Sequence, residues 1–379
     1  MARVPEALQR LIRRDELDPF AQTEIRTPCF PFEEQPPLGK GLDLGIAIVG
    51  AGFVVHLGHL PAYRKGGFRV LGIYDVDPAR AEEAAHCFEL PRVYRSLDEL
   101  VGDPQVSVVD VALPPHVVRR VVERAITAGK HALVQKPLAM NMVDAVEMVE
   151  LAEKKGVVLG VNQNSRWGCA VRAIKTCLKN GWLGEPVLAT IELRFKMRWQ
   201  EFLRDKQYQQ LVILNQGVHH LDIFRFLFGE PSLVSAVLGR YPGQLEPGET
   251  IAQYTLIYEG GLIASALDDG FPCTSDTGVS FRVEGTGGVA KGNFGWPKRV
   301  PDTLSVCSLQ LGRGWITPEF RSAFYPDSFL GTMADFLDAV GTGRQPLSSG
   351  RDNLKTLSLV FAAYRSAEER RQVQPSEIF

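Results

Sequence analysis

A lysine stands directly after a short apolar segment, in the sequence HALVQKP at residues 131–137. Lysine is costly to bury, and proline cannot continue the hydrogen bonding of a strand. Lys136 is therefore expected at the end of a strand, with its charged side chain aimed at a ligand. An amine in that place could hold a substrate hydroxyl and help to move its proton.

A pair of histidines offers a second candidate for proton chemistry. His219 and His220 lie in the sequence NQGVHHLD, ahead of the apolar run IFRFLFG. Histidine titrates near neutral pH, and His219 and Asp222 would share one face of a helix. One of two adjacent histidines is, however, often a helix-start or core residue. The H-x-x-D spacing has no evident third ligand, so no metal site is predicted.

The sequence GAGFVV at residues 50–55 predicts a turn that holds the phosphates of a dinucleotide. The first glycine permits a tight turn from a strand into a helix, and the second lets a pyrophosphate approach the backbone. The following helix points its first amides at the phosphates. Val55 is larger than the small residue usual at the third position. The residues expected to contact the cofactor here are Gly50, Gly52, Phe53 and Val54.

Two further strand ends extend this predicted cofactor site. Asp75 ends the next strand, where a carboxylate can accept hydrogen bonds from ribose hydroxyls and would repel an additional phosphate. We therefore expect NAD in preference to NADP. Pro114 and His116 follow the apolar run 106–113. They are either cofactor contacts or a helix-start proline with a solvated histidine.

These side chains need a parallel sheet to bring them to one edge. Short apolar runs, typical of strands buried on both faces, occur at 44–50, 70–75, 106–113, 131–134 and 157–161. Helical segments lie between them, and Gly129 and Gly156 are expected to end two of these helices. The alternation predicts βαβ units and an α/β fold with a doubly wound parallel sheet.

Beyond about residue 165 the alternation stops. A helix at 169–181 is followed by strand-like runs with glycine-rich turns, and alternation is visible at 253–258. This pattern predicts a largely antiparallel sheet with one solvated or partner-covered face. We expect an N-terminal arm at 1–43 that lies against the body or a partner, a nucleotide-binding domain at 44–165, and a second α/β domain with a C-terminal helix at 166–379.

The composition excludes several classes of protein. The 379 residues are 45% apolar and 23% charged, with a net charge of −2, which is ordinary for a globular protein and gives no basic excess for nucleic acid. No apolar stretch is long enough to span a membrane. The six cysteines form no C-x-x-C pair, and no secretion signal precedes them. A reducing cytoplasm is therefore expected.

The order of the motifs resembles the glucose–fructose oxidoreductase / inositol dehydrogenase (Gfo/Idh/MocA) family. After the glycine turn and the aspartate come Q-K-P (135–137), N-Q-N-x-R (162–166), G-E-P (184–186), G-x-H-x-x-D (217–222) and E-G-T-G-G (284–288). The resemblance implies a Rossmann domain followed by an α/β domain on an open, mostly antiparallel sheet. It also implies NAD(P)-dependent hydride transfer at a carbinol carbon of a sugar, cyclitol or related polyol, in a homodimer or homotetramer joined through that sheet.

Carried over residue by residue, the resemblance makes Lys136 and His219 the catalytic pair and Asn162 a cofactor or substrate contact. Gln135 and Lys136 also stand at the cofactor. Arg166 is expected either to bind an anionic group or to be an exposed helix-start charge. The expected substrate contacts are Lys136, Asn164, Arg166, Asn215, His219 and His220.

Two departures from the family pattern bear on mechanism. The family usually has E-K-P where this chain has Gln135, and an acidic residue often stands where this chain has Asn215. Each change replaces a carboxylate with its amide, which keeps the shape and loses a proton acceptor. Lys136 and His219 are therefore expected to handle the proton, while Asn215 orients the substrate.

Two other functions remain open on this sequence. One is a glycosidase or lyase that retains NAD, oxidises its substrate, eliminates and reduces again. The other is a protein that senses NAD or sugar without catalysis. The loss of two carboxylates favours a sensor, whereas the presence of both Lys136 and His219 favours an enzyme.

Overall fold

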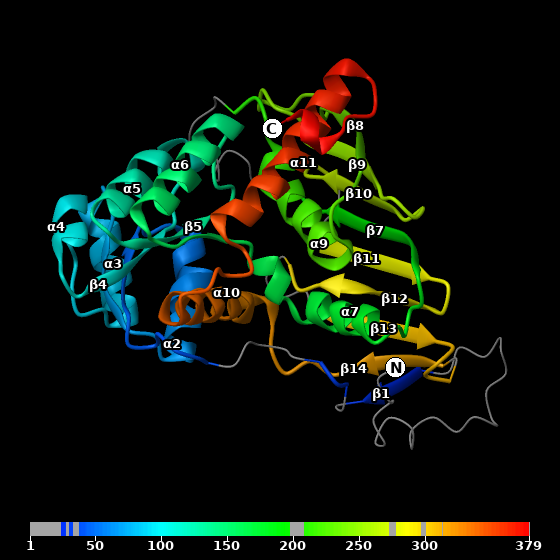
Figure 1. The fold of residues 1–379 in the computed structure, drawn as a ribbon, viewed down its shortest axis with the longest axis horizontal. Coiled ribbons are helices and arrows are strands. Elements are labelled where there is room, and N and C mark those ends of the chain that lie inside the picture. Colours follow the sequence, from blue (N-terminus) through cyan, green and yellow to red (C-terminus); the bar gives the residue numbers. More distant parts are fainter. Residues whose placement is uncertain are drawn as a thin grey trace. The chain divides into compact units, whose positions relative to one another are not determined.

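The structure is a computed structural model that describes residues 24–27, 30–32, 38–197, 208–272, 278–296, 301–312 and 314–378. The chain forms two compact units (Figure 1). The parallel-sheet unit comprises the described residues of Gln35–Asn164 and Tyr325–Ser358. The large-sheet unit comprises those of Met1–Glu34, Ser165–Phe324 and Leu359–Phe379.

The first unit contains the predicted parallel sheet, with strand order β3-β2-β4-β5-β6. Every neighbouring pair in it is parallel. An isolated parallel bridge also pairs Ile73 of β3 with Val93. The order reverses between β2 and β4, as in a doubly wound Rossmann sheet. The strands are β2 (Gly45–Val49), β3 (Val70–Tyr74), β4 (Val106–Val111), β5 (His131–Gln135) and β6 (Leu159–Asn162).

Local signals in the sequence explain where the helices of this unit begin and end. Asp77, Ser96 and Asn141 each accept a hydrogen bond from a backbone N–H in the first turn of the helix that follows. Gly129 and Gly156 take positive φ angles after two helices, as predicted. The elements are η1 (a π-helix, Val55–His59), α2 (Leu60–Gly66), α3 (Pro78–Phe88), α4 (Leu97–Gly102), α5 (Pro115–Thr127) and α6 (Met142–Lys155).

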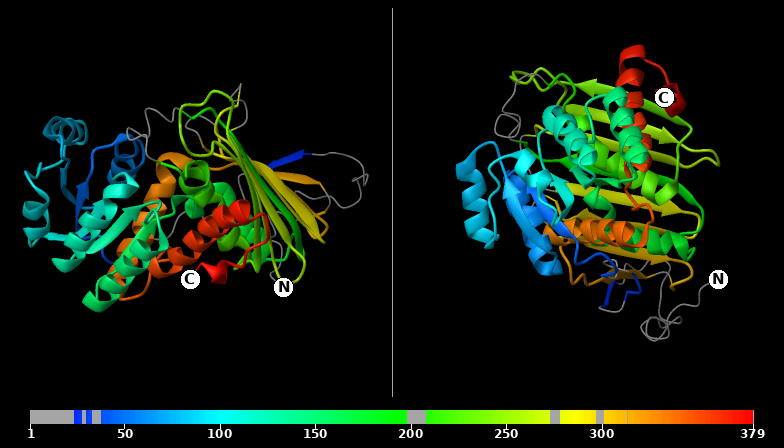
Figure 2. Two further views of the ribbon diagram at one scale, coloured as in Figure 1. Left: turned by 90° about the horizontal axis from the view of Figure 1, so that it is seen from above. Right: turned by 60° about the vertical axis from the view of Figure 1, so that its left-hand side comes forward.

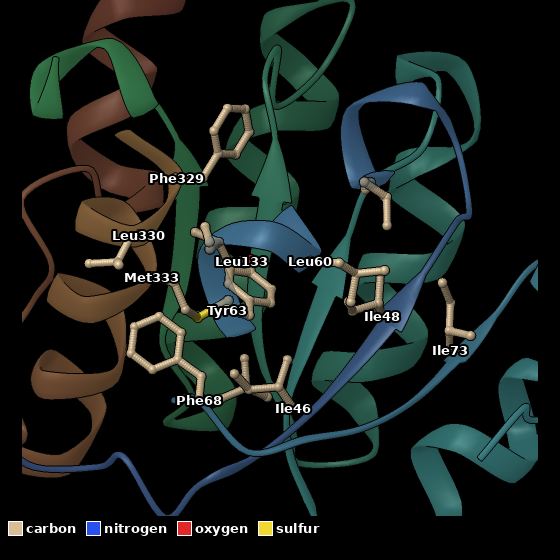
Figure 3. Packing of buried hydrophobic residues seen from close by; sticks show 14 of the residues in the cluster. Ile46, Ile48, Leu60, Tyr63, Phe68, Ile73, Leu133, Phe329, Leu330 and Met333 are labelled. Carbon is tan, nitrogen blue, oxygen red and sulfur yellow. The ribbon is translucent and has the colours of Figure 1, made fainter. Parts of the chain in front are cut away.

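A helix from late in the sequence completes the core of the parallel-sheet unit. Phe329 and Met333 of α10 (Phe324–Thr342) pack in one buried cluster with Leu133 of β5 and Tyr63 of α2 (Figure 3). The backbone N–H of Val161 also donates to the carbonyl of Ser348, 2.8 Å away. Residues 325–358 therefore belong to this unit, whereas the sequence placed all of 166–379 in one domain. An apolar helix face does not reveal which sheet it will cover.

The second unit is built on one large sheet, ordered β1-β14-β13-β12-β11-β7-β10-β9-β8. The pairs β1–β14 and β7–β10 are parallel and the other neighbours antiparallel, which confirms the predicted mostly antiparallel sheet. The strands are β1 (Glu24–Thr27), β7 (Pro186–Arg194), β8 (Leu233–Gly239), β9 (Ile251–Ile257), β10 (Ile263–Asp269), β11 (Gly278–Gly285), β12 (Gly288–Phe294), β13 (Thr303–Ser308) and β14 (Trp315–Pro318).

Helices lie along one face of the large sheet (Figure 2). Ala252, Tyr254 and Leu256 of β9 are buried, while Gln253 between them is exposed, so the predicted alternation is present. None of the described helices is long and apolar enough to cross a membrane. The remaining elements are η2 (Asn164–Trp167), α7 (Cys169–Lys179), η3 (a π-helix, Ile213–Gly217), α9 (Val218–Phe228), α11 (Gly350–Glu369, which continues from the first unit) and η4 (Pro375–Glu377).

Part of the expected N-terminal arm belongs to the large-sheet unit. β1 adds a parallel edge strand beside β14, and the Phe30 ring packs edge-on against Trp182 at 5.6 Å between centroids. These residues thus lie against their own chain. Residues 1–23, 28–29 and 33–37 of the arm lie outside the described residues.

Candidate functional site

The glycine turn has the geometry that a pyrophosphate requires. Gly50 has a φ of 104°, and a Cβ there would lie 2.4 Å from the carbonyl oxygen of Ala112. A Cβ on Gly52 would instead meet only the Arg80 guanidinium, at 3.7 Å, so the backbone there can be approached closely. Phe53 is 75% exposed beside this turn, and Val54 leads into η1. The residues present therefore fit a dinucleotide.

Asp75 is fixed beside this turn. Its Oδ2 accepts a 2.7 Å hydrogen bond from the N–H of Ala51, and its Oδ1 accepts one of 3.0 Å from the N–H of Asp77. Arg80 donates to the Ala51 carbonyl at 3.1 Å and braces the same loop. The carboxylate is thus buried and held at the end of β3, where the sequence predicted a ribose contact.

Lys136 follows the last residue of β5 and is half-buried. Burial lowers the pKa of its ammonium group to about 7. An amine with that pKa is present in both protonation states near neutral pH and can exchange a proton with a substrate. Its backbone N–H donates to Oε1 of the Gln135 side chain at 2.8 Å.

Asn162 lies beside Gln135 in the register of β5 and β6. Its side chain is buried, yet neither of its amide atoms has a hydrogen-bond partner among the described residues. A buried polar group without a partner costs about 1–3 kcal/mol, and such groups are typical of places that a ligand completes. This orphaned amide supports the predicted cofactor or substrate contact of Asn162.

The remaining predicted contacts of the first unit lie near the same strand ends. Pro114 is the N-cap residue of α5, shortly after the end of β4, and His116 is exposed in the first turn of that helix. Asn164 is buried and donates to the Ser328 hydroxyl at 2.9 Å. Asn164 is therefore engaged with α10, and a substrate contact from it stays a prediction.

A buried polar cluster next to Gln135 was not predicted from the sequence. His59 Nδ1 lies 2.7 Å from Asp110 Oδ2, and the Tyr63 hydroxyl donates to the same oxygen at 2.7 Å. All three side chains are buried. The available signal was the aspartate inside the otherwise apolar run VSVVDVAL, because a buried strand admits a carboxylate only with partners.

In the large-sheet unit, the segment that carries Asn215 and His219 presents only these two side chains. Every residue from Leu211 to Arg225 is buried except Asn215 and His219, which are half-buried. His219 Nδ1 lies 3.1 Å from the hydroxyl oxygen of Ser165. Asn215 lies in the π-helix η3, and such turns are frequent at functional sites.

Two residues expected at the substrate have partners inside this unit, and their substrate contacts stay a prediction. His220 is buried with its Nδ1 2.8 Å from Oδ1 of Asp268. Arg166 is buried and donates to both oxygens of Asp222, each at 2.7 Å. Arg166 is thus neither an exposed charge nor open to an anionic group through those two nitrogens. Residue type alone does not separate a buried ion pair from a ligand-binding cation.

Glu249 holds the backbone that leads to Asn215 and His219. Its carboxylate accepts hydrogen bonds from the N–H groups of Leu211 and Ile213 and, at 2.6 Å, from the Tyr364 hydroxyl. Burial raises the pKa of Glu249. This carboxylate therefore supplies hydrogen-bond acceptors to backbone N–H groups at the start of the π-helix η3.

Two family models match most of the chain. A model described as an oxidoreductase family with an NAD-binding Rossmann fold matches residues 44–163. A model for the C-terminal α/β domain of the same oxidoreductase family matches residues 175–374.

Named relatives are similar along most of their length. A D-apiose dehydrogenase of Paraburkholderia graminis is 29% identical over 339 residues, covering 86% of this chain and 88% of that protein. A myo-inositol 2-dehydrogenase of Thermotoga maritima is 26% identical, covering 81% and 91%. An oxidoreductase of Agrobacterium radiobacter, solved with NAD+, L-tartaric acid and magnesium, superposes with a TM-score of 0.79 at 26% identity, covering 89% of this chain and all of that one.

Replacing Glu249 with glutamine should lower the free energy of unfolding by about 1–3 kcal/mol at pH 7, because the new amide nitrogen would oppose a backbone N–H that now has an acceptor. The deficit should widen in acid, because a carboxyl group whose pKa is raised on folding, as burial raises that of Glu249, adds stability to the parent protein as it takes up its proton. Chemical denaturation measures both. Glu83→Gln, at an exposed position, is the matched control and should change little. Equal stability of the Glu249 variant and the parent at pH 7 would contradict this role.

Proposed function

Because this chain belongs to the Gfo/Idh/MocA oxidoreductase family, with an NAD-binding Rossmann domain and a C-terminal α/β domain, we propose that it transfers hydride between NAD and a carbinol carbon of a sugar, cyclitol or related polyol. The observation that carries the proposal is Lys136. Burial lowers the pKa of its amine to about 7. Lys136 directly follows β5, which lies in the same parallel sheet as β2, the strand that ends at the glycine turn. The dehydrogenases named above act on polyhydroxylated compounds, which supports the substrate class.

The residues that would hold the cofactor are Gly50, Gly52, Asp75 and Asn162. When bound, NAD supplies a hydride acceptor at the nicotinamide ring. Asp75 favours NAD over NADP, because its buried carboxylate would repel a phosphate on the ribose.

Lys136 and His219 would serve the proton of the reacting hydroxyl. In oxidation, the neutral Lys136 amine accepts a hydrogen bond from the hydroxyl and takes its proton as hydride leaves the carbon. His219, hydrogen-bonded to Ser165, is the second acid–base group. Asn215, an amide, can orient the substrate but cannot accept a proton at neutral pH.

The open face of the large sheet is the proposed subunit interface of a homodimer or homotetramer. The registers place Leu233, Ile257, Ile263 and Leu188 in one row across β8, β9, β10 and β7. Ile263 is 44% and Leu188 37% exposed on this face. A row of partly exposed apolar side chains on a sheet face is a surface that a second subunit could cover. The cysteine pattern favours a cytoplasmic location.

The direct test is NADH formation with a panel of sugars, cyclitols and sugar acids, read by absorbance of the reduced ring. Lys136→Met should lower kcat by roughly 10²–10⁴-fold on the best substrate. For oxidation, kcat/KM of the parent enzyme should rise with pH through about 7, since only the neutral amine accepts the proton. Lys136→Arg should lose this rise, because arginine stays protonated. Full activity of Lys136→Met would refute the assignment, and turnover without net NADH would identify the NAD-retaining alternative.

His219 and Asn215 should differ in their effect on turnover. His219→Ala should reduce kcat by roughly 10²-fold or more, because it removes an acid–base group. Asn215→Ala should act mainly on KM, because it removes an orienting hydrogen bond. Steady-state kinetics on the same substrate compares them, with Asn215→Asp as the variant that restores the family's usual carboxylate. Equal losses of kcat in the two alanine variants would defeat the division of roles.

Asp75→Asn should lower the ratio of kcat/KM with NAD to that with NADP by roughly tenfold or more, since the like-charge repulsion of the phosphate is removed. The matched control is Asp77→Ser, two residues along, which removes an exposed carboxylate and keeps an N-cap side chain. The ratio should stay unchanged in the control. An unchanged ratio in Asp75→Asn would count against the ribose contact.

A further inference from the structure

A chain of buried polar side chains leads from β4 to the backbone of Lys136. Asp110 Oδ2 lies 2.7 Å from His59 Nδ1, and His59 Nε2 lies 3.3 Å from Gln135 Nε2. Gln135 Oε1 then accepts the N–H of Lys136 at 2.8 Å. His59 and Asp110 are fully buried and Gln135 is 8% exposed.

The hydrogen bonds of this chain permit one arrangement of protons. The backbone N–H of Lys136 can only donate, so it must meet the oxygen of the Gln135 amide. The amide nitrogen of Gln135 therefore faces His59, and because it too can only donate, His59 Nε2 must carry a lone pair. The proton of the ring is then on Nδ1, which donates to Asp110.

The other groups around the ring agree with this arrangement. The Tyr63 hydroxyl of α2 donates to the same oxygen of Asp110, which is what an ionised carboxylate accepts. From α10, Phe329 packs on His59 at 5.0 Å between centroids. Asp327 is the acidic residue of α10 nearest to Phe329 in the sequence, and it is paired with Lys65 at 2.6 Å. Among the contacts of the His59 ring in the described part of the chain, the titratable groups are Asp110 and Tyr63.

We propose that Gln135 is a positioning residue which locks His59 as a neutral hydrogen-bond acceptor and, through this ring and Asp110, holds the backbone of Lys136 without placing a carboxylate beside its amine. This inference rests on the proposed role of Lys136. It gives a reason for the amide where the family usually has glutamate. A glutamate at 135 would offer His59 an acceptor, so the ring would take up a proton and a negative charge would stand next to Lys136.

The consequence for Lys136 follows from its neighbours. A carboxylate within about 4–6 Å favours the ammonium form of a lysine by one to three pK units. With an amide at position 135, desolvation is left as the main influence on this amine. The proposed lock therefore keeps Lys136 available as a base near neutral pH.

The test compares the parent enzyme with Gln135→Glu, which has the same shape. Histidine ¹⁵N NMR of the full chain should show one ring, assigned to His59 by its change in this variant, that stays neutral from pH 5.5 to 8.5 in the parent. In Gln135→Glu that ring should be protonated over most of the range. The pH at which kcat/KM for oxidation rises should move up, with roughly a tenfold loss at pH 7. Gln345→Glu, at an exposed position of the parallel-sheet unit, adds the same charge and should change neither readout.

If every histidine of the parent titrates between pH 5.5 and 8.5, or if the spectrum of Gln135→Glu equals that of the parent, the lock does not exist. A changed spectrum with an unmoved pH profile refutes the link to Lys136. The NMR result needs no substrate, so it tests the arrangement of protons independently of the proposed oxidoreductase reaction.

Discussion

The removal of the Lys136 amine from water is the interaction on which the account of this site depends. Desolvation disfavours the ammonium form, and the fold lowers the pKa of this lysine to about 7 from an ordinary value near 10.4. In the unfolded chain the ammonium group is solvated and carries no such penalty. This lysine therefore lowers the free energy of unfolding at pH values below about 7, and the cost disappears as the pH rises toward the pKa that the lysine has in the unfolded chain. The sheet keeps the residue there because β5 is buried and fixed between β4 and β6.

Both units use a buried carboxylate to support a π-helical turn that leads into an α-helix. In the parallel-sheet unit, Asp110 binds His59 at the end of η1. In the large-sheet unit, Glu249 binds the backbone at the start of η3, ahead of Asn215. A π-turn leaves backbone groups out of register, and it persists where side chains supply partners. The two supports explain why charged residues occupy interiors that are otherwise apolar.

The sequence predicted the parallel sheet, the glycine turn and the place of Asp75 because each follows from a local pattern. Gly50 needs a backbone conformation that other residues avoid, and strand ends are marked by where apolar runs stop. Pairings between distant residues were beyond such reasoning. His59 meets Asp110 across 51 positions, and Arg166 meets Asp222 across 56. The packing of Phe329 on the parallel sheet could not be predicted for the same reason, because its apolar helix could cover the sheet of either unit.

The most direct test of the central claim measures the protonation of Lys136 itself. Competitive acylation of the folded protein with acetic anhydride from pH 5 to 10, quantified by mass spectrometry of the peptide that contains Lys136, gives the pH at which the amine becomes nucleophilic. The account predicts a midpoint near 7 for Lys136, well below that of the exposed Lys154 in the same samples. A midpoint near 10 for both lysines would contradict it.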